Sequence, residues 1–345
     1  MERHTAITCL VAGMAIATVA GADSHAADFY KDKTMIIITS TGEGGGYDMI
    51  ARSFTRHMPK HIPGNPNMIV QNMPGGGHML ATNHLYNVAP KDGTVIGTVN
   101  QNVPSHQVLD GRGVRYDAGK FNWLGALENL NATIAVWHTA GIRSIEDART
   151  REVITGATGD GSSAFRYPLI MNIVLGTKFK IIKGYKSTAD IYTAMERGEV
   201  QARGGGYQSF RLQRPDWIRD KKVDFIVQIG RQREPALPDV PLWTDVATTD
   251  EQRQVLHLIA APISVGRPFL APPGLPAERV AILRNAFAAT VRDPGFITDG
   301  EKLSFETGLI SADDVTKIVL DTISAPPDIV AKAKAAMGEG DAADK

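Results

Sequence analysis

The chain has 345 residues, of which 43% are hydrophobic and 21% are charged, values that are ordinary for a globular protein with one large or two smaller domains. Its 37 basic and 37 acidic residues cancel, and no long block of like charges occurs, so the composition argues against a nucleic-acid partner. Beyond the N-terminal region, no apolar run reaches the roughly 18 residues that a membrane-spanning helix needs.

Residues 1–27 have the composition of a cleaved export signal. Arg3 precedes an apolar stretch rich in small residues, and the segment ends in "SHAAD", which fits cleavage after Ala26 or Ala27. A short N-terminal anchor or a buried helix is the alternative. The single cysteine, Cys9, lies in this segment, so we expect no disulfide, thiolate nucleophile or cysteine metal site in the mature protein. These features predict a location in a bacterial periplasm.

The rest of the chain alternates β-branched runs with helical patterns, which is typical of parallel α/β units. Two stretches, 152–165 and 200–210, are each expected to run from a strand through a glycine loop into a helix. Further strands are expected, in chain order, at 34–40, 67–72, 95–100, 121–129, 133–138, 179–185, 223–230 and 263–271. Helices are expected at 47–58, 78–88, from Ser144 onward, and at 187–199, 251–261, 272–287, 312–323 and 327–337. The helix that begins after Ser144 has a capping-box pattern from Ser144 to Asp147.

Four junctions between an expected strand and an expected helix are rich in glycine. They read "TGEGGGYD" at 41–48, "NMPGGGH" at 72–78, "GATGDGSSA" at 156–164 and "ARGGGYQS" at 202–209. In a parallel sheet such junctions gather at the carboxyl ends of the strands, where ligands bind. Free backbone N–H groups and the helix dipole favour an anion there, and glycine lets it approach the backbone. The alternative is that these glycines serve only as tight turns.

The first of these junctions does not fit a nucleotide-binding enzyme. The stretch 41–48 lacks the Lys-Ser/Thr pair of a P-loop, and no acidic residue closes a second strand at the offset of a dinucleotide-binding unit. Hydrolase signatures are absent from the sequence as well. His57 and His61 have the spacing of a metal pair, but Pro59 interrupts the helix between them, so solvent-exposed histidines are expected instead.

Three polar residues at expected helix starts have two interpretations each. Asp48 either contributes to a ligand site or only complements the helix dipole. Ser162 and Ser163 either add hydroxyl donors for a carboxylate or act as N-caps. Pro168 is compatible with the helix that follows them only if it falls within about its first turn.

The motifs in order identify a resemblance to a known family. The stretch 44–97, "GGGYDMIARSFTRHMPKHIPGNPNMIVQNMPGGGHMLATNHLYNVAPKDGTVIG", resembles the substrate-binding receptors of tripartite tricarboxylate transporters, also called Bug receptors. The likeness continues in order and spacing through "FNWLGALEN", "GATGDGSSA", "IIKGYKSTADIYTAMERGEV", "LPDVPLWTD" and "PFLAPPGLPAERVAILRNAF". It therefore covers nearly the whole chain after the leader.

The resemblance implies a type II periplasmic-binding-protein fold, an α/β architecture with two lobes joined by two crossover strands and a ligand cleft between them. With residues 1–27 as the signal peptide, the first lobe is expected at 28–128 and 230–345 and the second at 129–229. The family binds small organic carboxylates and hands them to membrane permease subunits. We accordingly expect a monomeric receptor that uses no cofactor, no metal and no nucleic acid.

The resemblance implies that the residues in the matching motifs correspond to the ligand-binding loops of the family. The chain departs from the family pattern at Arg203 to Tyr207, where the family often has an acidic, apolar stretch. Arg203 is expected either to bind a second carboxylate beside an open glycine loop or to point to solvent. The predicted ligand-binding residues are Gly44, Gly45, Gly46, Tyr47, Asp48, Pro74, Gly75, Gly76, Gly77, Asn100, Gln101, Gly161, Ser162, Ser163, Ala164, Tyr185, Lys186, Ser187, Arg203, Gly205 and Tyr207.

Two functions other than transport are also compatible with the sequence. A receptor of the same fold can present a ligand-dependent surface to a signalling partner, and the sequence does not separate that role from transport. An exported enzyme acting on a carboxylate would need a nucleophile with a base, and Ser162 has no evident histidine or lysine partner in the sequence. A receptor is therefore the expected function.

Overall fold

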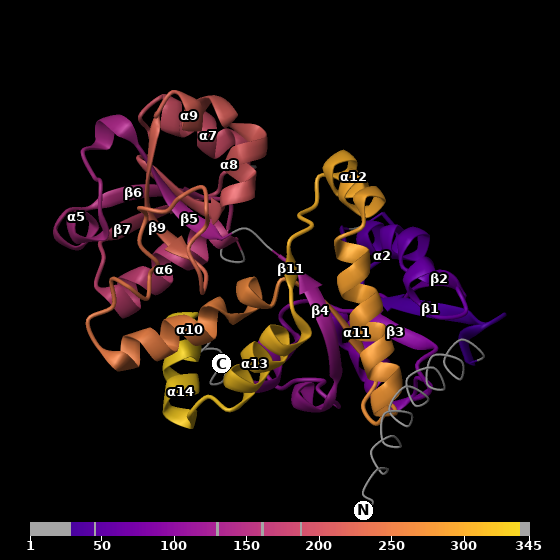
Figure 1. The fold of residues 1–345 in the computed structure, drawn as a ribbon. Helices are drawn as coiled ribbons and strands as arrows, with labels where there is room; N and C mark the ends of the chain where they lie inside the picture. Colours follow the sequence, from indigo (N-terminus) through magenta and orange to yellow (C-terminus); the bar gives the residue numbers. More distant parts are fainter. Residues whose placement is uncertain (1–28, 45, 129–130, 160–161, 187, 339–345) are drawn as a thin grey trace, which may run out of the picture.

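The computed structural model describes residues 29–44, 46–128, 131–159, 162–186 and 188–338 (Figure 1). The predicted signal peptide lies outside these ranges, as do three of the predicted site residues, Gly45, Gly161 and Ser187. Within the described ranges, no helix combines the length and the apolar character that crossing a membrane would require.

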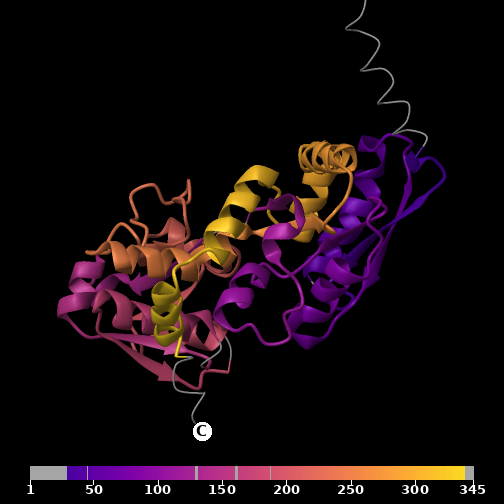
Figure 2. The same cartoon turned by 90° about the horizontal axis from the view of Figure 1, so that it is seen from below.

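Two separate β-sheets form the centres of two lobes, which lie side by side in Figures 1 and 2. The first sheet has the order β11-β4-β10-β3-β1-β2 and the second β7-β6-β8-β5-β9. The strands of the first sheet are β1 (Thr34–Thr39), β2 (Asn67–Asn72), β3 (Val95–Thr98), β4 (Asn122–Leu127), β10 (Arg267–Ala271) and β11 (Leu309–Ile310). Those of the second are β5 (Ala132–Trp137), β6 (Val153–Ala157), β7 (Phe179–Lys183), β8 (Ala202–Gly206) and β9 (Val223–Ile229).

The two sheets repeat one arrangement. In the first, β2, β1 and β3 are parallel neighbours, and β10 then runs antiparallel between β3 and β4. In the second, β7, β6 and β8 are parallel neighbours, and β5 runs antiparallel between β8 and β9. In each lobe the antiparallel strand belongs to a connection that comes from the other lobe. This arrangement confirms the predicted α/β fold with two lobes.

Helices cover both sheets. Around the first sheet lie α2 (Gly46–His57), α3 (Met79–Asn87), α4 (Val103–Leu109), α11 (Ala277–Val291), α12 (Pro294–Leu303) and α13 (Ala312–Ile323). Around the second lie α5 (Ile145–Thr150), α6 (Ser163–Leu175), α7 (Thr188–Glu196), α8 (Tyr207–Gln213), α9 (Pro215–Arg219) and α10 (Asp250–Val265). α13 and α14 (Pro327–Ala336), drawn in yellow, lie between the lobes, where α14 contacts α4, α6 and α10 (Figures 1 and 2).

Each lobe has its own core. In the first, Phe54 of α2 packs against Phe269 of β10 and Phe287 of α11, with ring centroids 4.3 and 5.1 Å apart. In the second, the Tyr192 and Trp217 ring centroids lie 5.0 Å apart. All of these side chains are fully buried, and burying each aromatic ring contributes about 1.5–3 kcal/mol. Each lobe is thus stabilised by apolar contacts of its own.

The chain returns to the first lobe later than the predicted residue 230. Trp243, Ala247, Leu256 and Ala260 belong to the core of the second lobe, so the connection after β9 and one face of α10 pack there, while another face of α10 packs against α4 and α14. The first core is rejoined only at β10. The apolar periodicity of α10 could not show this, because it does not reveal which sheet a helix covers.

Three local expectations were wrong. The expected strand at 263–271 begins only at Arg267, because α10 continues to Val265. The glycines of 204–206 form no loop, since they belong to strand β8. Pro168 lies inside α6 rather than in its first turn, and its ring packs against Gly204, where a Cβ would come 3.3 Å from Pro168 Cδ. The capping box of α5 between Ser144 and Asp147 is confirmed.

Candidate ligand-binding site

The predicted loops of the first lobe meet at one edge of its sheet, where β1, β2 and β3 end. The parallel register of these strands places their carboxyl ends together. The hydroxyl of Tyr47, in the first turn of α2, accepts a hydrogen bond of 3.1 Å from the backbone N–H of Gln101, which follows β3. This bond joins the loop after β1 to the loop after β3.

Asp48 organises the first glycine loop. Its carboxylate is buried, and one oxygen accepts from the Gly44 N–H at 2.8 Å and from Arg52 Nε at 2.9 Å, while the other accepts from Asn72 Nδ2 at 2.9 Å. Burial alone would raise the pKa of Asp48, but the hydrogen bonds from Arg52, Asn72 and Gly44 outweigh it and lower that pKa. The side chain therefore holds the loop shape.

The second glycine loop is fixed by a histidine that sequence reasoning missed. Gly75 and Gly76 have φ values of 140° and 55°, and His78 follows at 79°. His78 Nδ1 lies 3.1 Å from the Ser40 carbonyl oxygen, to which it donates, so its Nε2 accepts from Asn100 Nδ2 at 3.3 Å. His78 thus ties together the ends of β1 and β3. Its position directly after the glycine triplet was the available signal.

Arg267 was also missed and lies at the same edge. Because β10 runs antiparallel to β3, its first residue lies at the end where β1 and β3 finish. A Cβ on Gly46 would meet Arg267 Nη1 at 3.1 Å, and Arg267 Cζ lies 5.6 Å from the Tyr47 ring centroid. The sequence shows only an arginine near an expected strand, and the direction of that strand decides where its charge lies.

The start of α6 in the second lobe uses its serines differently. Ser162 is the N-cap: its Oγ accepts from the Phe165 N–H at 3.3 Å and donates to the Gly159 carbonyl at 2.7 Å. Ser163 is partly exposed and lines the cavity described below, whereas Ala164 is buried. The capping interpretation thus describes Ser162, whereas Ser163 lines the cavity.

The loop after β7 and the start of α8 complete the second-lobe edge. Tyr185 is half-buried and donates its backbone N–H to the Ala157 carbonyl at 3.4 Å, whereas Lys186 is exposed. Tyr207 is buried, with its ring centroid 5.4 Å from that of Phe225. Burial raises the pKa of the Tyr207 hydroxyl. Tyr207 therefore acts mainly as packing beneath this edge.

Arg203 neither points to solvent nor lies in an open loop, since it is 5% exposed within β8. Its Nη1 donates to the Tyr192 hydroxyl at 3.3 Å and its Nη2 to Thr188 Oγ1 at 3.2 Å. The guanidinium lies 5.2 and 5.3 Å from the Tyr192 and Phe210 ring centroids. A Cβ on Gly205 would come 2.7 Å from Arg203 Nη1, so glycine is needed there to make room for the guanidinium.

One cavity of about 380 Å³ opens between the lobes. It brings together two of the predicted site residues, Gln101 from the loop after β3 and Ser163 from the start of α6. The glycine loops at 42–48 and 74–77 and the residues Tyr185, Arg203 and Tyr207 do not line it. Its full lining is Gln101, Asn102, Ser105, His106, Leu109, Asp110, Ser163, Arg166, Tyr167, Ile170, Ile259, Pro262, Ile263 and Met337.

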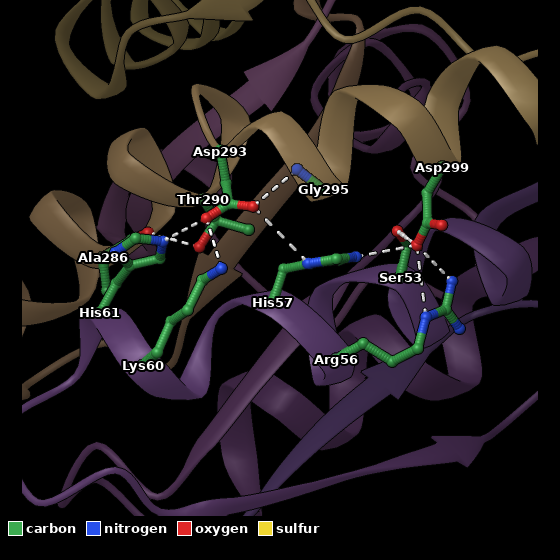
Figure 3. A network of polar contacts seen from close by, with 10 residues as sticks. All are labelled: Ser53, Arg56, His57, Lys60, His61, Ala286, Thr290, Asp293, Gly295 and Asp299. Atoms are coloured by element: carbon green, nitrogen blue, oxygen red, sulfur yellow. Dashed lines mark hydrogen bonds and ion pairs between the residues drawn. The ribbon is translucent and has the colours of Figure 1, made fainter.

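The two histidines with metal-like spacing belong to a separate ionic network on the first lobe (Figure 3). They are not solvent-exposed as expected: His57 Nε2 lies 2.9 Å from Asp299 Oδ2, and His61 Nε2 lies 3.3 Å from Asp293 Oδ2. Arg56 and Lys60 pair with the same two carboxylates. Within the described ranges, no group of three or more side chains is arranged to hold a metal ion. The network joins α2 to α12.

The chain is similar to one receptor family over most of its length. The family model described as tripartite tricarboxylate transporter family receptor, TctC, matches residues 50–334. No curated protein matches the sequence significantly. A ligand-free TctC solute-binding protein from Polaromonas superposes with a TM-score of 0.70 at 18% identity, over 90% of this chain and 99% of that one.

Two solved structures from Rhodopseudomonas palustris share the fold at a TM-score of 0.52 each. MatC with bound malate is 19% identical over 86% of this chain and 99% of its own. Rpa4515 with adipate is 17% identical over 87% of this chain and 97% of its own. The family model covers far more than half of the chain, and the predicted resemblance is thereby confirmed. The chain belongs to the solute-binding receptor family of tripartite tricarboxylate transporters.

Proposed function

We propose that this protein is an exported periplasmic receptor that captures a small organic carboxylate between its lobes and delivers it to a membrane permease. The observation that carries the proposal is the cavity of about 380 Å³ that Gln101 of the first lobe and Ser163 of the second both line. Its volume lies in the range of small-molecule sites. The ligands named for two structural relatives, malate and adipate, are carboxylates.

The described residues of the first-lobe glycine loops do not line this cavity but adjoin it at Gln101, whose N–H donates to the Tyr47 hydroxyl. From there the first lobe would supply backbone N–H groups and one positive charge. The loops Gly44–Asp48 and Pro74–Gly77 end near the first turns of helices, where the dipole favours an anion. Arg267 adds a guanidinium beside Gly46. In this arrangement Asp48 and His78 are positioning residues, because their polar atoms are used to hold the loops.

The second lobe would close the site from the other side. Ser163 at the start of α6, the loop Tyr185–Ser187 and the end of β8 are the groups proposed to reach the ligand. Several charge-assisted hydrogen bonds of about 1.5–3 kcal/mol each are enough for micromolar affinity, which corresponds to about −8 kcal/mol, after ordering costs. Bonds that form only when both lobes converge favour the closed state.

Ser162 gives no support to a catalytic role. Its hydroxyl hydrogen is donated to the Gly159 carbonyl and its oxygen accepts from the Phe165 N–H, so the group acts as a helix cap. A nucleophilic serine needs a base within hydrogen-bond reach. We therefore propose binding without turnover.

The experiment is a thermal-shift and calorimetric screen of mono-, di- and tricarboxylates, together with native mass spectrometry of the protein as purified. A true ligand at 100 times its dissociation constant should raise the free energy of unfolding by roughly 2.7 kcal/mol. The bound acid should be recovered unchanged after prolonged incubation. If no carboxylate shifts the melting temperature and no acid copurifies, the proposed function is wrong.

A further inference from the structure

The cavity between the lobes changes in character along two of the helices that line it. On the α4 side its lining runs from Gln101 through Ser105 to Leu109, and along α6 it runs from Ser163 to Ile170. Spacings of four and seven residues place each set on one face of its helix. In both helices the polar residues come first and the apolar residues follow.

The apolar residues at the far ends of these helices lie together. Leu109, at the end of α4, belongs to an apolar cluster against which Val174, near the end of α6, also packs. Ile259 of α10 and Met337, which follows α14, pack against this cluster and against the core of the second lobe. Both are only partly buried and both line the cavity, so an apolar ligand group can cover them. We call Leu109, Ile170, Ile259 and Met337 the apolar end of the cavity.

The polar end of the cavity offers a free hydroxyl and positive potential. Ser105 is 5% exposed, and its Oγ is buried with no hydrogen-bond partner among the described residues. A buried hydroxyl of this kind is costly unless a ligand or a water molecule pairs with it. Ser163 is the first of the thirteen residues of α6, where the helix dipole favours an anion, and Arg166 lines the cavity one turn later. These features suit one carboxylate.

The charges at the end of α4 disfavour a second carboxylate at the apolar end. Asp110 follows Leu109 directly and also lines the cavity. The hydrogen bond from Arg112 lowers the pKa of Asp110, so this carboxylate is negative at neutral pH. His106, which lines the cavity as well, lies 3.6 Å from the same carboxylate. A second ligand carboxylate at the apolar end would lose water and meet the negative charge of Asp110.

We propose that the receptor selects a monocarboxylate with an apolar body. The carboxylate lies at the polar end, beside Gln101 and Ser163, and the hydrocarbon part lies against the apolar end between α4, α6 and α10. This inference rests on the proposed function and adds to it the class of acid. That class differs from malate and adipate, the diacids named for two structural relatives.

Isothermal titration calorimetry of the unaltered protein with straight-chain monocarboxylates of two to ten carbons tests the inference. Affinity should rise roughly threefold to fourfold with each added methylene, because each one leaves water, and should fall once the chain is longer than the cavity. The α,ω-diacid of the best length should bind at least roughly tenfold more weakly than the monoacid. This comparison needs no variant and so does not depend on the folding of one.

Two variants change the depth of the apolar end in opposite directions. Ile259→Phe fills part of it, so the best chain should become shorter and the affinity for the original best acid should fall roughly tenfold. Met337→Ala enlarges it, so the best chain should become longer. In both variants propionate should bind within about threefold of its original affinity, because its short chain does not reach the altered side chain.

The matched control is Ile173→Phe, which makes the same exchange on α6 at a side chain that is 52% exposed and does not line the cavity. It should leave the whole chain-length profile unchanged. Urea denaturation of each variant shows whether it is folded. If Ile259→Phe does not fold, the profile of Met337→Ala and the comparison of acids in the unaltered protein decide.

The outcomes separate the two proposals. If affinity does not depend on chain length, or if the diacid binds as tightly as the monoacid, the apolar selection is wrong and the carboxylate receptor stands. Folded Ile259→Phe and Met337→Ala proteins with the original best chain length would also overturn the selection. If no acid of any kind binds the unaltered protein, the proposed function fails, and the selection fails with it.

Discussion

At the scale of single residues, polar side chains around the first-lobe loops are used to shape backbone. Asp48 collects donors from Gly44, Arg52 and Asn72, which come from three different segments. Gly44 itself has a φ of 75°, a conformation that other residues adopt at a cost of about 1 kcal/mol or more. The loop is therefore pre-organised, which lowers the ordering cost of binding a ligand.

We expect Asp48→Asn to weaken carboxylate binding roughly tenfold, because an amide cannot accept all three hydrogen bonds and the loop loosens. Calorimetric titration gives the affinity, and urea denaturation gives the loss of stability, expected at about 1–2 kcal/mol. Asp147→Asn, which alters the same helix position in α5 away from the cleft, is the control and should leave affinity unchanged. Unchanged affinity in Asp48→Asn would mean that the loop does not contact the ligand.

At the scale of elements, α2 is attached to α12 by ions as well as by its apolar face. Asp293 caps α12 through a hydrogen bond of 2.9 Å from the Gly295 N–H, and it also pairs with Lys60 (Figure 3). The hydrogen bond from Lys60 is the main cause that lowers the pKa of Asp293 to about 2, and the one from Arg56 likewise lowers the pKa of Asp299 to about 2. The charged forms of both carboxylates thus stabilise the fold.

The pH dependence of stability follows from these shifts. Both folded pKa values lie below the unfolded value of 3.8, so the contribution is complete above about pH 4 and disappears as the pH falls toward 2. Because water screens these side chains, we expect about 1 kcal/mol from each. Urea denaturation at pH 7, 4, 3 and 2 should show a smaller loss on acidification in Asp293→Asn/Asp299→Asn than in the unaltered protein.

The control for this measurement is Asp313→Asn, since the Asp313 carboxylate is 93% exposed beside Arg284. It should follow the unaltered protein at every pH. If the double variant loses as much stability on acidification as the unaltered protein, the network of Figure 3 does not contribute to the acid sensitivity.

The return connection shows how an element boundary can depend on another segment. Gly266 separates α10 from β10 with φ 66° and ψ −143°, and a Cβ there would come 2.2 Å from the Leu127 carbonyl oxygen. Leu127 ends β4, the strand that leaves for the second lobe. Both connections between the lobes therefore pass within contact of each other, which limits how the lobes can move.

At the scale of the whole molecule, two lobes with separate cores meet at a cavity between α4, α6 and α10. Such a construction lets one lobe move as a body while each core stays intact, with α14, which contacts both α4 and α10, as a further link beside the two chain connections. A ligand changes the balance between open and closed states only by the contacts that differ between them. Small-angle X-ray scattering should therefore show a smaller radius of gyration with saturating carboxylate than without it. An unaltered protein that binds the carboxylate with no change in scattering would contradict lobe closure, although not binding itself.

Sequence patterns alone were enough to predict the family, the alternating order of strands and helices, and the glycine-rich junctions after the parallel strands. These features are local, since hydrophobic periodicity, caps and turn residues act over a few positions. Sequence patterns also sufficed for the capping box at Ser144, whereas the short helices α4 and α9 have too few turns to show a period. The predicted site residues stay predictions until a ligand is bound.

Only the tertiary structure shows where the arginine side chains near the predicted site lie and how the chain passes between the lobes. Arg267 lies at the first-lobe edge because β10 runs antiparallel, and Arg203 is buried because Tyr192, Phe210 and Gly205 surround it. The helix α10 packs one face into the second core and another against α4 and α14. Each of these facts depends on contacts between segments far apart in the chain, and the pattern within one segment carries no information about which partner it meets.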